Sequence, residues 1–593
     1  MSTPESAAAA GIPWKAVGTG TALALVAFLM FIALPEADNE QVVVAPTDQT
    51  EVKQQLRSEQ ELTRIFSGMR AGHLDSTLDR QAAVDDLNRW ANEFPLNEGQ
   101  VLSQDEDLLR QLIPGDFQES VLGERFTPND AGHIRMSLLA SQIVSTIKSR
   151  VKHEVPESDP GYEIAVITAA FHYVWQNVGE DAQQRVLTPY EVFIYGRGTP
   201  PDRIWCFAEL ARQLACDTVL IAPKQAEQPL PPLVGVLTTR DELLLFEPSL
   251  GIPLADLSAT PTGLLPNTPA TLKEVLETPD FFKNYQFAAV EKMGLGEFAY
   301  PIKHEHLKSV EILIAGHPSQ WAPRMASVEF RTPSDQEALF YTGLGQNSLR
   351  QNGAYDRVVG VGAKNGWWAA NDVQVWLDPL ALDIRLEQDR NSPATSAANW
   401  QQMNRIMQGP EVVNATVDGI ELAQRSLEDV RIEQLTGKSA TALSHLLAIR
   451  NANQQYKSDI NAYAADFATF RTAQCQMDIG QWPAATQTLL GYLNVSSGHQ
   501  LWTKEAVEHL AWIQMQELEI APPEAEVNPL APFIVFRQLP EISYRQLFQL
   551  HYWARVLQAS GRLGGLENAS PTGSGDASSG RPPSPPLPTP LAE

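Results

Sequence analysis

Residues 196–214 (GRGTPPDRIWCFAELARQL) constrain the fold more than any other stretch, because a glycine-rich turn there runs directly into a helix. Cys206 lies in the first half of that helix. A thiol near the positive end of a helix has a lowered pKa and is a candidate nucleophile. A free cysteine is also a small apolar residue, and its neighbours Trp205 and Phe207 are typical of a buried helix face. The rest of the chain must supply the partners that distinguish these two interpretations.

The segments around this motif predict an α+β domain. Before it, apolar residues three and four apart predict helices at 56–94, 133–151 and 163–178. After it, short apolar runs bounded by turn residues predict strands, at 218–222, 233–237, 243–246 and 310–315. Helices followed by strands favour an antiparallel sheet with helices packed against it.

The order of these elements resembles the transglutaminase-like superfamily, whose fold is shared with papain-type cysteine enzymes. The resemblance covers about residues 165–254 and implies a triad of Cys at the helix start, His on the next strand and Asp before a Pro on the strand after. Gly198 matches the glycine of the family's helix, and Arg212 matches its arginine. The nucleophile position then falls on Pro200, the histidine position on the strand around Val234, and the carboxylate position on Glu247. The resemblance therefore implies the fold of that family in a catalytically degenerate form.

An enzymatic alternative uses Cys206 in a shifted register, as the nucleophile of a peptidase or acyl transferase. The chain has no histidine between His172 and His304, so one of these two would have to serve as the base. A thiol without a base or a cationic partner is a poor nucleophile at neutral pH. No catalytic residue is therefore expected, and the enzymatic alternative stays open as the second hypothesis.

Composition excludes some partners. The formal net charge of −27 over 593 residues argues against nucleic acid, which requires Lys and Arg patches. The three cysteines fit no zinc or redox spacing, and neither a metal nor a cofactor is expected. His304 and His306 would share one face of a strand and could begin a metal site, but no further ligands are in view. The pair Trp367–Trp368 could stack on a sugar, although burial is the more common role of such a pair.

The N-terminal region predicts a membrane anchor. Residues 16–34 (AVGTGTALALVAFLMFIAL) carry no charge and are long enough to cross a bilayer once. Lys15 precedes them and acidic residues follow, which favours export of the bulk of the chain. We expect an uncleaved signal anchor and an extracytoplasmic location, on the periplasmic side in a bacterium; a cleaved signal peptide is the alternative.

The C-terminal region predicts a second, all-helical domain. Residues 473–493 and 502–518 predict helix pairs. Small residues at 473, 480, 484 and 485, with Trp482 and Leu489, resemble one tetratricopeptide-type repeat, with no second copy at a fixed period. The last residues are rich in Gly, Ser and Pro and predict a disordered tail. The predicted multidomain organisation is a cytoplasmic stub and transmembrane anchor (1–35), a linker (36–55), the transglutaminase-like domain (56–320), a connecting region (321–399), the helical repeat-like domain (400–561) and the tail (562–593).

Together these patterns predict a membrane-anchored extracytoplasmic binding or scaffolding protein. The chain is also similar to a group of membrane-anchored bacterial proteins that join a degenerate transglutaminase-like domain to repeat-type helices. We expect a peptide or carbohydrate ligand at the turn 196–201 and the strand near Val234. A protein partner is expected on the helical C-terminal domain.

Overall fold

The computed structural model describes residues 49–69, 77–95, 103–181, 185–224, 230–261, 263–333, 336–345, 353–391, 407, 416–417, 420–421, 426–453, 459–494, 501–521 and 528–563. By its internal contacts the chain divides into two units, Met1–Leu56 and Arg57–Glu593. Of the first unit, only the beginning of helix α2 (Gln49–Gly68) is described. Everything below concerns the second unit.

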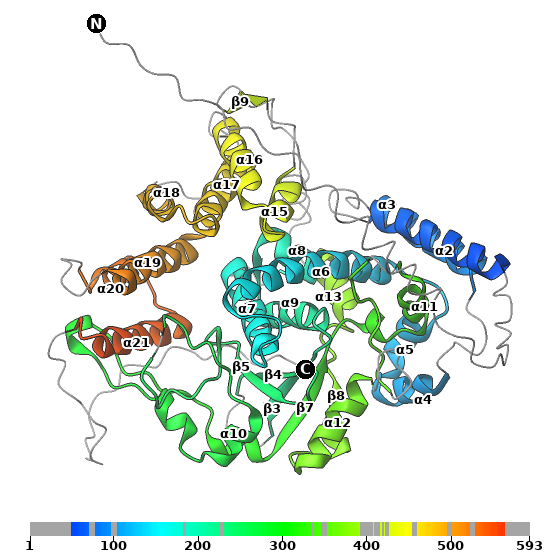
Figure 1. Cartoon of the computed structure of the whole chain (residues 1–593), viewed down its shortest axis with the longest axis horizontal. Helices are drawn as coiled ribbons and strands as arrows, with labels where there is room; N and C mark the ends of the chain where they lie inside the picture. Colours follow the sequence, from blue (N-terminus) through cyan, green and yellow to red (C-terminus); the bar gives the residue numbers. More distant parts are fainter. Residues whose placement is uncertain are drawn as a thin grey trace, which may run out of the picture. The chain divides into compact units, whose positions relative to one another are not determined.

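A six-stranded sheet forms the centre of this unit (Figure 1). Its strand order is β6-β5-β4-β3-β7-β8. The strands are β3 (Asp217–Pro223), β4 (Leu233–Leu237), β5 (Leu243–Glu247), β6 (Ile252–Pro253), β7 (Val310–Ala315) and β8 (Val373–Val375). The four strands predicted from the sequence are confirmed as β3, β4, β5 and β7. The prediction of a wholly antiparallel sheet is wrong, because β8 pairs parallel to β7.

Burial explains why these strands form where they do. Every residue of β4 and β5 is buried, which is why both read as continuous apolar runs. In the register of the sheet, Leu220 of β3 lies opposite Val234 of β4, and Val234 lies opposite Phe246 of β5. Each of these three side chains has at most 1% of its surface exposed, so the middle of the sheet is apolar core.

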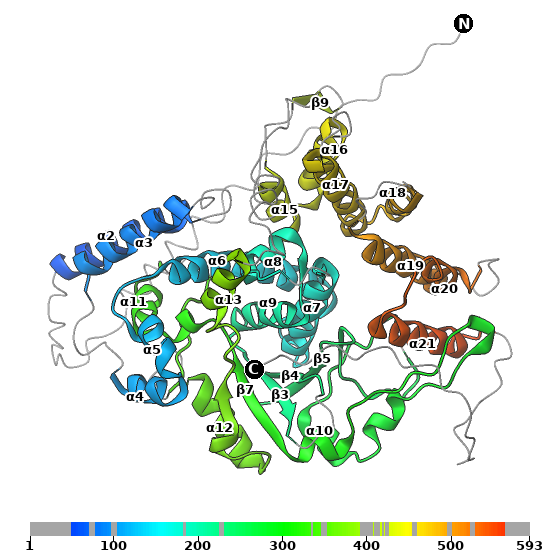
Figure 2. The same cartoon turned by 180° about the vertical axis from the view of Figure 1, so that it is seen from behind.

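Helices α7 (Tyr162–Asn177) and α9 (Pro200–Arg212) pack side by side over the sheet (Figures 1 and 2). Phe171 of α7, Phe207 of α9 and Phe246 of β5 form one aromatic cluster, with ring centroids 4.8 to 5.2 Å apart. Fully burying each ring contributes about 1.5–3 kcal/mol. The cluster fixes both helices on the strands that follow the motif.

Further helices complete the α/β body of the chain. A two-residue parallel pair, β1 (Gly179–Glu180) with β2 (Arg197–Gly198), ties the end of α7 to the motif turn. The other helices up to residue 391 are α3 (Thr77–Glu93), α4 (Ser103–Leu112), α5 (Gly115–Leu122), α6 (Pro128–Glu154), α8 (Pro189–Tyr195), α10 (Leu272–Glu277), α11 (Pro323–Arg331), α12 (Ala354–Asn365) and α13 (Leu382–Asn391).

The region beyond residue 400 is mainly helical. Each helix from α15 to α19 packs on the next, and α19 packs on α20. A two-residue strand pair, β9 (Thr416–Val417) with β10 (Ile420–Glu421), shows that the region is not all-α as predicted. The helices are α15 (Leu427–Leu435), α16 (Ser439–Asn453), α17 (Asp459–Asp478), α18 (Trp482–Asn494), α19 (Thr503–Ile520), α20 (Ala531–Phe536) and α21 (Tyr544–Ala559).

The membrane prediction requires a correction. None of the helices in the described ranges is both long enough and apolar enough to cross a bilayer. The longest, α6, has 27 residues but carries Arg135, Lys148 and Arg150 along its length. The predicted anchor (16–34) and the predicted disordered tail beyond residue 563 lie outside the described residues. We therefore withdraw the transmembrane signal anchor, the single-pass membrane assignment and the extracytoplasmic location. The fold class becomes a mixed α/β protein with 19 described α-helices and one six-stranded sheet.

Candidate functional site

The motif turn begins α9 with a proline at the position implied for a nucleophile. Gly196 has φ 67°, a left-handed conformation that ends α8 and that glycine adopts without strain. Thr199 caps α9: its hydroxyl accepts from the Asp202 amide, and the Asp202 carboxylate accepts from the Thr199 amide at 2.8 Å. Pro200 is the first helical residue and is exposed. The side chain at this helix start therefore offers neither a thiol nor a hydroxyl.

Cys206 lies inside the core. Its side chain is fully buried, and its thiol lies 3.6 Å from the carbonyl oxygen of Pro189. Burial raises the pKa of the Cys206 thiol well above its ordinary value, and the nearby carboxylates Asp202 and Glu209 raise it further. These surroundings oppose formation of the thiolate that a cysteine nucleophile requires.

The other two positions implied by the resemblance are also enclosed. Val234 has no exposed surface in the middle of the sheet. The Glu247 carboxylate is fully buried, accepts hydrogen bonds from the Ser249 amide at 2.9 Å and the Ser249 hydroxyl at 2.7 Å, and is bonded to the Tyr300 hydroxyl. Burial raises the pKa of Glu247, although these hydrogen bonds act in the opposite direction. The carboxylate holds the turn after β5 and orients no histidine.

The C-terminal helices cover the motif turn. Arg197 of the turn donates to the carbonyl of Leu501 at 2.7 Å. Arg431 of α15 donates to the carbonyls of Phe193 at 3.0 Å and Asn177 at 2.9 Å. Arg471 of α17 approaches the Asn177 carbonyl at 3.4 Å and the Gly196 carbonyl at 3.5 Å.

Asn177 ends α7, while Phe193 and Gly196 lie at the end of α8, where helix carbonyls have no partner within the helix. Cations satisfy these carbonyls and complement the negative end of each helix. The place where the sequence indicates a ligand is therefore occupied by the chain's own helices.

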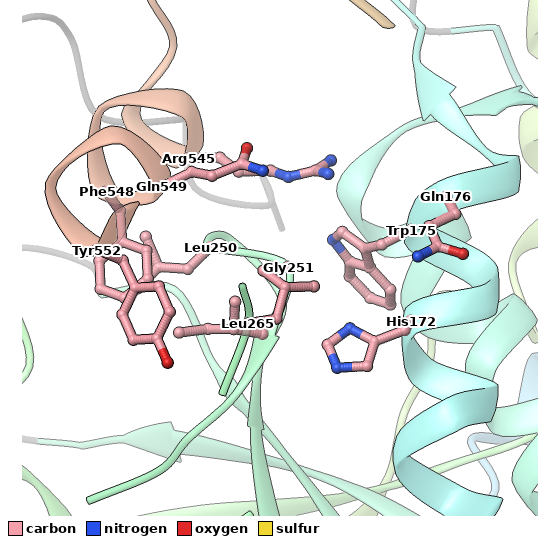
Figure 3. A pocket seen from close by; sticks show the side chains of 11 residues that line it. His172, Trp175, Gln176, Leu250, Gly251, Leu265, Arg545, Phe548, Gln549 and Tyr552 are labelled. Carbon is pink, nitrogen blue, oxygen red and sulfur yellow. The ribbon is translucent and has the colours of Figure 1, made fainter. Parts of the chain in front are cut away.

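A pocket lies beside this region, between α7, the turn after β5 and α21 (Figure 3). Its cavity volume is about 30 Å³, and its empty space counted with the open mouth is about 390 Å³. Figure 3 shows His172 and Trp175 on one side and the α21 side chains on the other. Gly251, with φ 68°, lies between them, and a Cβ atom there would come 2.4 Å from the Trp175 ring.

Two polar atoms in the pocket have no partner within the described part of the chain. The ring of His172 hydrogen-bonds to the carbonyl of Pro266, while its Nε2 is buried and unpaired. Burial lowers the pKa of His172 to about 4, so the ring is neutral at pH 7. With the proton on the other nitrogen, Nε2 is a hydrogen-bond acceptor. The Oε1 atom of Gln549 is a second buried, unpaired acceptor.

A cluster of charged residues adjoins the pocket. Arg545 of α21 lines the pocket and lies 3.3 Å from the carboxylate of Glu508 on α19. Arg203, in the first turns of α9, is only 7% exposed, and within the described residues its guanidinium has neither a hydrogen bond nor an ion pair. Burial, and then the positive charge of Arg545, lower the pKa of Arg203 to about 10, against the opposing effects of Glu505 and Glu508.

Glu505 completes this cluster. Its Oε2 atom is buried and unpaired within the described ranges. Burial raises the pKa of Glu505, although Arg197 and Arg203 lower it. The cluster thus combines buried and half-buried charges of both signs, and Arg203 and Glu505 have incomplete hydrogen bonds within the described residues. This arrangement is more common at ligand sites than in ordinary cores.

The remaining candidates from the sequence lie elsewhere. His304 and His306 are in a short 3-10 helix (His304–Lys308) instead of a strand, and they bond to the backbone of Val275 and Lys303. In the described part of the chain no group of three metal-ligating side chains comes together. Trp368 is buried, and its indole donates to the Val358 carbonyl at 3.2 Å, which favours the packing role for this pair.

Comparison with known proteins gives no further identification: no protein-family model, curated protein or solved structure matches the chain. The pocket residues escaped prediction because they come from segments up to 380 positions apart. A detectable signal was Glu247-Pro248-Ser249-Leu250-Gly251, whose last residue is the left-handed glycine of the pocket.

Proposed function

We propose that this chain is a non-catalytic binding protein, built on an α/β body that resembles a degenerate transglutaminase-like domain. The observation that carries the proposal is the burial of Cys206, whose thiol lies against the backbone carbonyl of Pro189. The three positions implied for a triad support it, because Pro200 is no nucleophile, Val234 is no base and Glu247 is bonded to Tyr300 and Ser249.

The arrangement of the C-terminal helices also supports binding over catalysis. They cap the ends of α7 and α8 and cover the motif turn, which removes the open cleft that a peptidase needs for an extended substrate. The pocket between α7 and α21 keeps unpaired polar atoms and an open mouth instead. A small cavity with a few convergent polar groups is suited to holding a small ligand.

Thiol labelling tests the absence of catalysis. The full-length native protein is treated with iodoacetamide at pH 6 and pH 8, and the peptide containing Cys206 is followed by mass spectrometry. We expect no modification until denaturant is added, because Cys206 has no exposed surface. A Ser67→Cys variant, with its thiol on an exposed position of α2, is the positive control. Rapid labelling of native Cys206 at pH 6 would show a real thiolate and restore the enzymatic alternative.

A further inference from the structure

We propose that the pocket between α7 and α21 binds the head group of a small free α-amino acid, an inference that rests on the proposed binding function. The carboxylate is held by Arg545, and the ammonium group donates to His172 Nε2 and Gln549 Oε1.

The two arginines point to a carboxylate. The Arg545 guanidinium lines the pocket with one ion pair, to Glu508 at 3.3 Å, and has further N–H donors to offer. Arg203 is a buried cation without a hydrogen bond or an ion pair in the described ranges, and Arg545 lies close enough to lower its pKa. Burying a guanidinium unpaired is costly, and a second cation beside it adds to the cost. A carboxylate bound to Arg545 forms charge-assisted hydrogen bonds there and offsets the repulsion between the two cations.

Two neutral acceptors, His172 Nε2 from the α7 side and Gln549 Oε1 from the α21 side, point to an ammonium group between them. His172 Nε2 and Gln549 Oε1 are both acceptors, and both are buried without a donor in the described part of the chain. Aromatic residues, among them Trp175 and Phe548, line the same space. Neutral acceptors and aromatic faces attract a cation with N–H donors.

The charges near the pocket and its volume narrow the class of ligand further. Arg203 and Arg545 are the cations of this cluster, and the carboxylates of Glu180, Glu505 and Glu508 act on Arg203 with the opposite sign. A pocket that offers a cation at one place and neutral acceptors at another favours a zwitterion over a simple anion or a simple cation. The cavity volume of about 30 Å³ has room for about two water molecules. The cavity therefore takes only part of a small ligand, with the rest in the open mouth, and glycine or alanine fits better than a large ligand.

Isothermal titration calorimetry of the full-length protein tests the proposal, with L-alanine, glycine, acetate, L-alaninamide and N-acetyl-L-alanine as probes. We expect L-alanine and glycine to bind, and each probe that lacks the carboxylate or the ammonium group to bind at least about tenfold more weakly. Arg545→Gln weakens L-alanine binding by about tenfold to a hundredfold. Gln549→Met weakens L-alanine binding but leaves acetate binding unchanged, because the Oε1 acceptor that it removes is proposed to contact only the ammonium group.

Arg89→Gln is the matched control, since Arg89 forms an exposed ion pair with Asp86 at 2.7 Å, on α3 and outside the pocket. If Arg545→Gln fails to fold, as judged by circular dichroism, Arg545→Lys replaces it; Lys keeps the charge, loses the planar fork, and weakens binding by a smaller factor. Three results overturn the proposal: no binding of either amino acid to the folded protein, equal binding to the Arg545 and Arg89 variants, or acetate binding as tightly as L-alanine. The proposed non-catalytic function fails separately, through labelling of Cys206.

Discussion

Replacing Arg431 by Met tests whether the helical region is held to the α/β body by capped helix ends. The Arg431 side chain is 1% exposed and donates to Phe193 O at 3.0 Å, Asn177 O at 2.9 Å and Gln434 Oε1 at 2.6 Å. Methionine fills similar space but donates nothing, so two buried carbonyls at the ends of α7 and α8 lose a charged partner. Each such loss costs about 1–3 kcal/mol, and we expect a total of about 3–5 kcal/mol.

Hydrogen exchange followed by mass spectrometry measures this cost where it arises. Peptides covering residues 173–200 report local opening of the α7 and α8 ends, which global melting of a protein this large does not resolve. We expect faster exchange there in Arg431→Met and unchanged exchange in β3 and β4. Arg64→Met is the control, because Arg64 is exposed and its ion pairs with Glu61 and Asp86 contribute at most about 1 kcal/mol. If both variants exchange alike across 173–200, the capping argument is wrong.

Three further predictions concern the pocket and the turn beside it. Gly251→Ala should destabilise the protein by about 1–2 kcal/mol, because φ is 68° and the new Cβ would meet Trp175 at 2.4 Å; thermal melting measures this, and an unchanged melting temperature would contradict it. His172 has a folded pKa lowered to about 4 from 6.5, so its contribution to stability is present above pH 6.5 and is lost as the pH falls towards 4. Between pH 6.5 and pH 4 the free energy of unfolding of the wild type should therefore fall by up to about 3 kcal/mol more than that of His172→Gln, as measured by urea titrations. An equal fall in both proteins would refute the lowered pKa of His172. Tyr300→Phe should lower the free energy of unfolding by about 1–3 kcal/mol, because it removes the hydroxyl that donates to the buried Glu247 carboxylate. This loss should be smaller at low pH, where Glu247 is protonated and carries no charge for the hydroxyl to stabilise.

The sequence predicts the strands well and the site poorly, for physical reasons. Strands β3 to β5 lie in the core, so their sequences are continuous apolar runs that can be recognised without knowing which elements pack against them. The short strand β8 (VQV) has no such signal, and its parallel pairing with β7 turns the expected antiparallel sheet into a mixed one. Pro200 and Cys206 could be placed by counting along one helix. His172 and Arg545 could not be brought together, because their proximity depends on how the C-terminal helices fold back onto the α/β body.

Buried arginines distinguish structural positions from the proposed binding position. Arg431 and Arg471 are each 1% exposed, and both donate to backbone carbonyls at helix ends, so their charge is compensated by the fold itself. Arg324 is similarly enclosed and forms a two-bond ion pair with Asp130, at 2.8 and 2.9 Å. Arg203 is nearly as buried as these three, yet in the described part of the chain it has neither a hydrogen bond nor an ion pair, and Glu180, Glu505 and Glu508 act on it only through space. The fold thus satisfies Arg324, Arg431 and Arg471 through its own atoms, whereas Arg203 lies near Arg545, to which the proposed ligand carboxylate would add a negative charge.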